Sequence, residues 1–186
     1  MGSISSVCTK KRIIDVTSQR IFTEEEVNVL RRQWPVMMTN VDQNAVNLFM
    51  NLFTINRNLM TKFDFAAGYY FDAEKTLNDA RLVYHVRRVY QLVDMIIGAL
   101  DDQLKYNEVM KMIEGIGEVH MKYKIHTVDF EDFTEAFLMN LAEVLRGTFD
   151  EKSKTIWRKL ITEIVFHVGS YNRNDQLSRS SLNGKR

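Results

Sequence analysis

The sequence contains one proline, one cysteine and eight glycines among its 186 residues, so few residues interrupt a helix. Cys8 alone can form neither an internal disulfide nor a cysteine-rich zinc site. The net charge is only +1, with basic and acidic residues interspersed, which provides no broad basic surface for nucleic acid. No apolar run reaches the roughly 18 residues of a membrane-spanning helix, and no apolar segment at the start is typical of a secretion signal. These absences favour a reducing, cytoplasmic setting without nucleic acid as a partner.

The residues that are abundant favour helices joined by short turns. Hydrophobic residues make up 45% of the chain, and neither strand-like alternation nor an internal repeat is evident. The length suits one domain with a sizeable core. We therefore predict an all-α protein with a flexible arm over residues 1–22, a folded domain over 23–170 and a disordered polar tail over 171–186.

Capping residues and apolar periodicity locate the expected helices. Thr23 followed by Glu24, Glu25 and Glu26 has the form of a capping box, which predicts a helix start, and Pro35 predicts a kink in that helix. Further helices are expected over 41–53, 74–100, 105–122, 130–144 and 156–168, with an aromatic bend over 59–71.

Two histidines fall on apolar faces of two different predicted helices. One face consists of Leu82, His85, Val89, Leu92, Val93 and Ile96, and the other of Val109, Met112, Ile113, Ile116 and His120. Both faces have the spacing of one side of a helix, so both imidazoles should point inward. A lone inward histidine is usually a structural residue hydrogen-bonded to a carbonyl. Two of them on neighbouring helices, with Phe63 and Phe65 nearby, favour instead the two sides of a flat iron macrocycle.

The order of several features along the chain resembles that of the globin family. The features are Trp34, the pair Leu52 and Phe53, the string Lys62-Phe63-Asp64, His85 with Val89, His120 and the aromatic-rich helix from Phe130. The resemblance covers about residues 23–170. It implies a globin fold, with helices packed around a haem pocket, and haem b as the cofactor.

The resemblance also implies roles for individual residues. It assigns His120 to the proximal iron ligand, His85 to the distal histidine, Phe63 to the haem edge, Phe49 and Val89 to the distal side and Ile116 to the proximal side. Arg88 is the best candidate for a cation that pairs with a haem propionate. The interpretation of Arg88 as an ordinary solvated arginine is equally good. His126 is expected at the surface near the pocket mouth, and His167 is expected to be structural.

Sequence leaves the coordination of the iron open. If His85 is a sixth ligand, the protein is a hexacoordinate globin suited to one-electron transfer or to redox or oxygen sensing, with an unidentified redox partner. If His85 only hydrogen-bonds a bound gas, the protein is an oxygen carrier or store. The chain is similar to neuronal and membrane-tethered invertebrate globins and to globin X, which favours the first interpretation. Oxygen, NO and CO are the expected gas ligands. Nitrite reduction or NO removal is a third reading, and a haem-free interaction module is a fourth.

The first twelve residues fit an acylation signal. Gly2 with Ser6 matches the myristoylation pattern, and Cys8 and the basic residues Lys10, Lys11 and Arg12 follow. One myristoyl chain binds membranes only weakly, so stable anchoring needs a second membrane-binding group. A palmitoyl group on Cys8 or the basic trio would supply it. We therefore expect a cytoplasmic protein anchored to the inner leaflet of the plasma membrane. The alternative is a solvated arm or a cloning remnant.

Overall fold

The computed structural model describes residues 21–63, 75, 79–125 and 127–183. Over these residues the chain is helical and contains no strand, as predicted. The α-helices are α1 (Glu24–Met38), α2 (Val41–Ile55), α4 (Ala80–Ala99), α5 (Gln103–Lys122), α6 (Thr127–Leu145) and α7 (Glu151–Asn183). Two short 3-10 helices, η1 (Arg57–Lys62) and η2 (Arg146–Thr148), follow α2 and α6.

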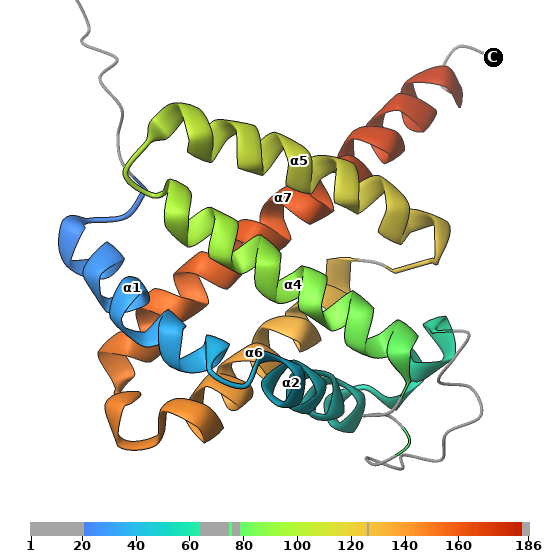
Figure 1. Ribbon diagram of the computed structural model, residues 1–186. Coiled ribbons are helices and arrows are strands. Elements are labelled where there is room, and N and C mark those ends of the chain that lie inside the picture. The colour runs from blue at the N-terminus through green and yellow to red at the C-terminus, as the bar shows by residue number, and fades with distance from the viewer. Residues whose placement is uncertain (1–20, 64–74, 76–78, 126, 184–186) are drawn as a thin grey trace, which may run out of the picture.

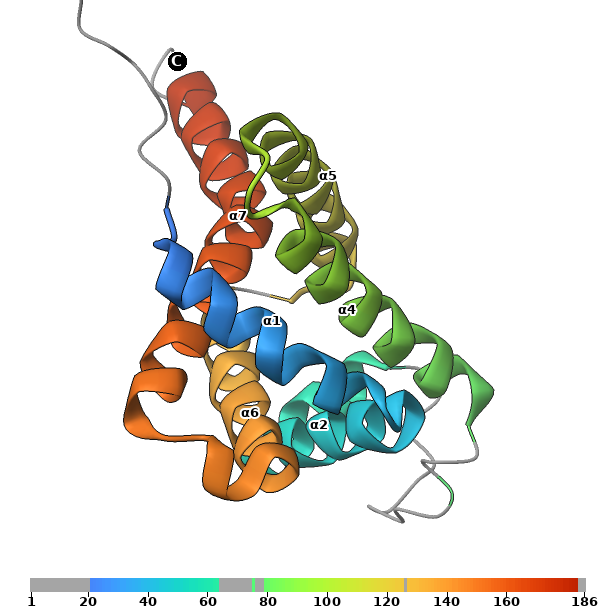
Figure 2. The ribbon, with the colours of Figure 1, turned by 60° about the vertical axis from the view of Figure 1, so that its left-hand side comes forward.

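The helices pack in crossed pairs around one core. In Figures 1 and 2, α5 packs against α7, whereas α2 lies against α6 and α4. Helix α1 contacts α4, α6 and α7, and closes the remaining side of the core. At its centre Trp34 lies between Tyr90 and Trp157, with ring centroids 5.2 and 5.8 Å away. Offset and tilted aromatic pairs at this spacing stabilise a core beyond their buried area.

Helix α1 begins where the capping box predicts. The Thr23 amide donates to Glu26 Oε2 at 2.8 Å, and the Glu26 amide donates to Thr23 Oγ1 at 3.3 Å. Phe22, assigned above to the flexible arm, is buried at 3% exposure. The ammonium of Lys159 lies 4.7 Å from the centre of its ring. The folded domain therefore includes Phe22, because an aromatic side chain next to a helix start can pack against the core.

Two expected helix boundaries differ from those in the structure. Helix α4 begins at Ala80, with Asp79 as its N-cap, rather than at residue 74. The aromatic bend beyond Phe63 and residues 1–20 lie outside the described residues. Helix α7 continues to Asn183, where a disordered tail was expected over 171–186. No proline or glycine occurs between Ser170 and Asn183, so no residue in this stretch stops the helix.

The apolar faces agree with prediction on most helices, and Met112 is the exception. Ala45, Leu48, Phe49, Leu52 and Phe53 are all buried on α2. On α5 the buried residues are Tyr106, Met110, Ile113 and Gly117, whereas Met112 is 42% exposed. No helix among the described residues is long and apolar enough to cross a membrane.

Gly117 allows α5 and α7 to approach closely. A Cβ atom at this position would lie 2.1 Å from the carbonyl oxygen of Val168 on α7. We expect Gly117→Ala to lower the free energy of unfolding by about 2–3 kcal/mol, because a backbone atom cannot move aside without separating the helices. Urea unfolding followed by circular dichroism measures the change.

Gly115 provides a matched control for that substitution, since a Cβ there meets nothing within 4 Å. Gly115→Ala should raise the free energy of unfolding by about 0.5–1 kcal/mol, because alanine favours the helix. Equal effects of the two substitutions would contradict the close approach of α5 and α7.

Candidate haem site

The structure brings His85 and His120 close together. His85 lies in the first half of α4, and His120 lies in the last turn of α5. Their ring centroids are 6.3 Å apart, with 56° between the ring planes. Residues separated by 35 positions in the sequence thus form one site, because α4 and α5 pack together after the turn at Leu100–Asp102.

Phenylalanine rings surround the two imidazoles. On the His85 side, the centroids of Phe49 and Phe63 lie 5.5 and 5.6 Å from the imidazole centroid, both edge-on. On the His120 side, Phe130 of α6 lies 5.6 Å away. The aromatic shell offers large apolar surfaces to any flat group held between the two histidines.

A hydrogen bond within α5 sets the tautomer of His120. Its Nδ1 lies 2.9 Å from the carbonyl oxygen of Ile116, which can only accept, so Nδ1 carries the hydrogen. The other ring nitrogen, Nε2, is then left with a lone pair. This is the arrangement of a metal-binding histidine, because the bond to the carbonyl fixes the ring and increases its basicity.

The turn after His120 has the hydrogen bonds of a Schellman motif. The Ile125 amide donates to the His120 carbonyl at 3.2 Å, and the Lys124 amide donates to the Met121 carbonyl at 2.9 Å. Lys124 has φ of 57°, a left-handed conformation that usually selects glycine or asparagine. This tight reversal joins α5 to α6, and α6 carries Phe130 beside His120.

His85 is held in its neutral form. Burial, which is the largest cause, and the nearby charges of His120 and Arg88 together lower the pKa of His85 to about 4. Since only a neutral imidazole can offer a lone pair to a metal, His85 is available as a ligand at neutral pH.

The other predicted site residues lie near this pair or outside the described part of the chain. Val89 and Ile116 are partly buried, and Val89 packs against the core cluster. Arg88 is exposed, with its guanidinium 5.8 Å from the centre of the Tyr84 ring. Gly2, Cys8 and His126 lie outside the described residues.

His167 lies on α7, and its two ring nitrogens contact carboxylates. Nδ1 lies 3.3 Å from Glu114 Oε1 and Nε2 lies 3.2 Å from Glu163 Oε1. The contact with Glu114 joins α7 to α5, in agreement with the structural role expected for this histidine.

Sequence reasoning did not identify Phe130 as a site residue. The resemblance includes it only as the start of an aromatic-rich helix, ten positions after His120. The left-handed conformation of Lys124 reverses the chain, so that Phe130 lies beside His120. A lysine in the sequence gives no signal for that conformation.

The dimensions and chemistry of the site fit a porphyrin iron. Metal–imidazole bonds are about 2.0 Å long, which places the centres of two imidazoles on opposite sides of one metal about 6.4 Å apart. The observed separation is 6.3 Å.

Among the described residues no group of three or more His, Cys, Asp or Glu side chains could hold a metal ion. A porphyrin supplies four nitrogens itself and needs only one or two axial ligands from the protein. The fold and site therefore define an all-α protein whose histidine-containing site suits a haem iron.

Comparisons with known proteins agree with this class. A model of the globin family matches residues 46–168. Cytoglobin-2 of Oryzias latipes is 23% identical over 167 residues, covering 86% of this chain and 88% of its own. Neuroglobin of Danio rerio is 22% identical over 143 residues, covering 77% and 87%. A Drosophila melanogaster globin structure has a TM-score of 0.71 at 16% identity, covering 79% of this chain and 93% of its own.

The chain belongs to the globin family. Globins bind haem b and gas ligands such as oxygen, so haem b is the cofactor of this protein.

Proposed function

We propose that both His120 and His85 bind the haem iron, so that the protein is a bis-histidyl, hexacoordinate globin. The separation of 6.3 Å between the two ring centroids carries this proposal. A hexa-coordinate hemoglobin of Drosophila melanogaster, with a TM-score of 0.70, adds support from the fold. Phe49 and Val89 would shape the distal side, and Phe63 would stack on the haem edge. Ile116 would lie beneath the proximal side, and Arg88 would pair with a propionate.

Two axial imidazoles suit one-electron chemistry. Bound haem supplies an iron that changes oxidation state by one electron and can bind a gas at an open position. When His85 and His120 keep the same positions in both oxidation states, electron transfer requires little rearrangement of the protein. A tethered His85 also competes with external gases at a high effective concentration, which lowers apparent gas affinity. We therefore infer a role in electron transfer with an unidentified partner, or in redox or oxygen sensing.

The visible absorption spectrum of the reduced protein, without added ligand, tests this coordination. We expect two narrow bands, which are typical of low-spin iron with two imidazoles. A single broad band would indicate five-coordinate iron. That result would favour the second candidate function, an oxygen carrier or store in which His85 donates a hydrogen bond to the bound gas.

The spectrum of the ferric protein should be constant on acidification from pH 8 to about pH 5. The pKa of His85 is lowered to about 4, so its imidazole stays neutral throughout this range. Protonation, and with it loss of the sixth ligand, requires a pH below that value, because iron binding competes with the proton. A spectrophotometric titration measures this. A conversion to high-spin iron centred near pH 6.5, the ordinary histidine value, would contradict it.

We also propose that the protein is anchored at the inner face of the plasma membrane through Gly2, Cys8 and the basic trio Lys10, Lys11 and Arg12. Protein purified from eukaryotic cells should carry a myristoyl group on Gly2 and a palmitoyl group on Cys8, detected by mass spectrometry. Gly2→Ala should abolish the first modification and release the protein from the membrane fraction. An unmodified Gly2 would contradict the anchor.

A further inference from the structure

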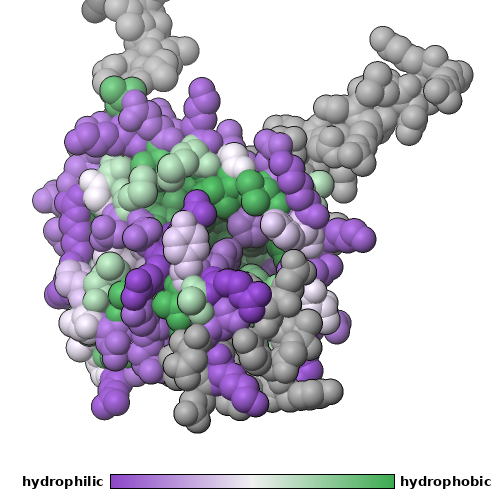
Figure 3. All heavy atoms as spheres, turned by 45° about the vertical axis from the view of Figure 1, so that its right-hand side comes forward, coloured by the Kyte–Doolittle hydropathy of each residue, from purple (hydrophilic) through white to green (hydrophobic). Residues whose placement is uncertain are grey.

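The outer face of α5 is apolar although it faces solvent. Its large side chains are Leu104, Met112, Val119 and Tyr123, exposed by 70%, 42%, 50% and 57%. At about 100° per residue these positions share an arc of about 100° on one side of the helix and its C-cap. Figure 3 shows a band of hydrophobic side chains across the upper part of the molecule, at the height of α5 in Figure 1.

Lysines lie at the edges of this arc. Lys105 and Lys122 occupy its two borders, with side chains that are 69% and 68% exposed. Each forms an ion pair at the surface, Lys105 with Asp102 at 3.4 Å and Lys122 with Glu118 at 3.5 Å. Gly115 lies within the arc with open space around it. Glu108 is also in the arc. An apolar face with lysines at its borders and a tyrosine at one end is typical of a helix that lies in a membrane interface.

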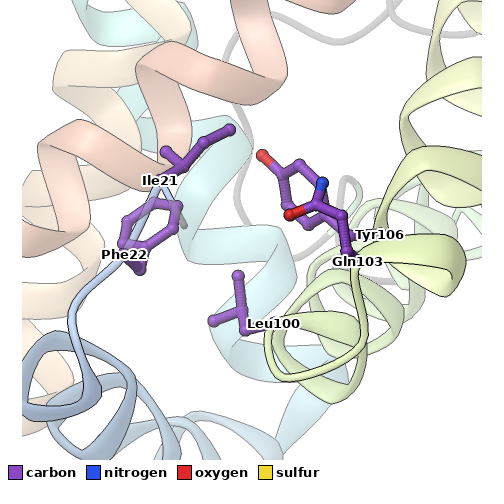
Figure 4. Close-up of a pocket in the computed structure, with 5 residues that line it drawn as sticks. All are labelled: Ile21, Phe22, Leu100, Gln103 and Tyr106. Carbon is purple, nitrogen blue, oxygen red and sulfur yellow. The ribbon is translucent and has the colours of Figure 1, made fainter. Parts of the chain in front are cut away.

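The N-terminal chain joins the folded domain at the N-terminal end of α5. Figure 4 shows Ile21 and Phe22 lining one pocket together with Leu100, Gln103 and Tyr106. Eight residues separate Ile21 from the basic trio that ends at Arg12. Such a stretch spans at most about 30 Å, which is about the length of α5. The basic trio can therefore reach the surface on which the α5 face would lie.

We infer that the outer face of α5 is a membrane-contact surface that lies on anionic phospholipid. The apolar side chains would enter the boundary between headgroups and acyl chains. The lysines of α5 and the basic trio would lie at the headgroups, where each charge attracts anionic lipid. Because α5 carries His120 in its last turn, this contact would hold the haem site in one orientation to the membrane. The inference rests on the proposed membrane location and adds a second contact to the acyl anchor.

A matched pair of double variants tests the contribution of the face to binding. Met112→Gln/Val119→Thr alters α5, and Met139→Gln/Val128→Thr makes the same changes on α6, where the side chains are 43% and 62% exposed. Haem-loaded, myristoylated protein is sedimented with vesicles of phosphatidylcholine and phosphatidylserine. We expect the α5 variant to lower the partition coefficient about tenfold and the α6 variant to change it less than about twofold. Equal effects of the two variants would overturn the inference.

Chemical labelling of single cysteines locates the contact directly. In the Cys8→Ser background, Leu104→Cys and Val119→Cys report on α5, and Val128→Cys reports on α6. With the vesicles present, a membrane-impermeant maleimide should modify positions 104 and 119 at least about tenfold more slowly, whereas modification at 128 should be unchanged.

The remaining outcomes separate this inference from the acyl anchor. If the protein sediments with vesicles but all three cysteines react at their solution rates, the anchor stands and the α5 contact is wrong. If the myristoylated protein does not sediment, both are wrong. If positions 104 and 119 become protected without vesicles as protein concentration rises, a second copy covers the face, and the membrane contact is again wrong.

Discussion

Replacing His120 by leucine should leave a helical protein that has lost most of its haem. The imidazole of His120 is oriented by its 2.9 Å contact with the Ile116 carbonyl and presents Nε2 to the site. Without it the iron keeps only the tethered His85. We expect the dissociation constant for haem to rise more than about a hundredfold. Removing only the group that hydrogen-bonds to a metal ligand already lowers metal affinity about 10–100-fold, and here the ligand itself is removed. Transfer of haem to an acceptor protein measures this change.

A cavity variant separates loss of the ligand from loss of the fold. In His120→Gly the site keeps its aromatic shell of Phe63 and Phe130, and added imidazole should restore a low-spin spectrum. His167→Leu is the matched control, since that histidine contacts Glu114 and Glu163 instead. Full haem retention by His120→Leu, or loss of haem by His167→Leu, would contradict the assignment of the proximal ligand.

Replacing His85 by leucine should have the opposite consequence, because haem remains bound and the iron becomes accessible. In the wild-type protein an external gas binds only in the fraction of molecules where His85 has left the iron. With that competitor removed, carbon monoxide should bind the ferrous protein about a hundredfold faster. Flash photolysis and rapid mixing measure the rate.

Tyr84 provides the control for this substitution. It is the preceding residue on α4, is 64% exposed and lies under the guanidinium of Arg88. Tyr84→Leu should leave the binding rate of carbon monoxide unchanged. If His85→Leu and the wild-type protein bind carbon monoxide equally fast, the iron is already open, and the oxygen-carrier interpretation replaces the redox one.

The sequence predicted those parts of the fold that depend on local periodicity. Thr23 and Glu26 formed the expected capping box, and the apolar spacing on α2 located its buried face. The same spacing placed His85 and His120 on inward-facing positions, and the structure brings the two rings together. Each of these features follows from side chains three or four positions apart, which a sequence displays directly.

Features that depend on tertiary contacts could not be predicted in this way. The close approach at Gly117 depends on the position of the Val168 carbonyl on another helix. The contact of Phe130 with His120 depends on the left-handed Lys124. Met112 fits an inward spacing on α5, but the helix turns it outward, because Met110 and Ile113 define the buried side. Periodicity gives the width of an apolar face and leaves its rotation about the helix axis to packing.

Iron K-edge X-ray absorption of the ferric protein is the most direct measurement of the coordination proposed for this globin. It reports the number of iron ligands and identifies imidazole rings by their outer carbon and nitrogen shells. The account predicts six nitrogen ligands, including two axial imidazoles at about 2.0 Å, and loss of one imidazole shell in His85→Leu. Five-coordinate iron in the wild-type protein, or two imidazole shells that persist in His85→Leu, would contradict it.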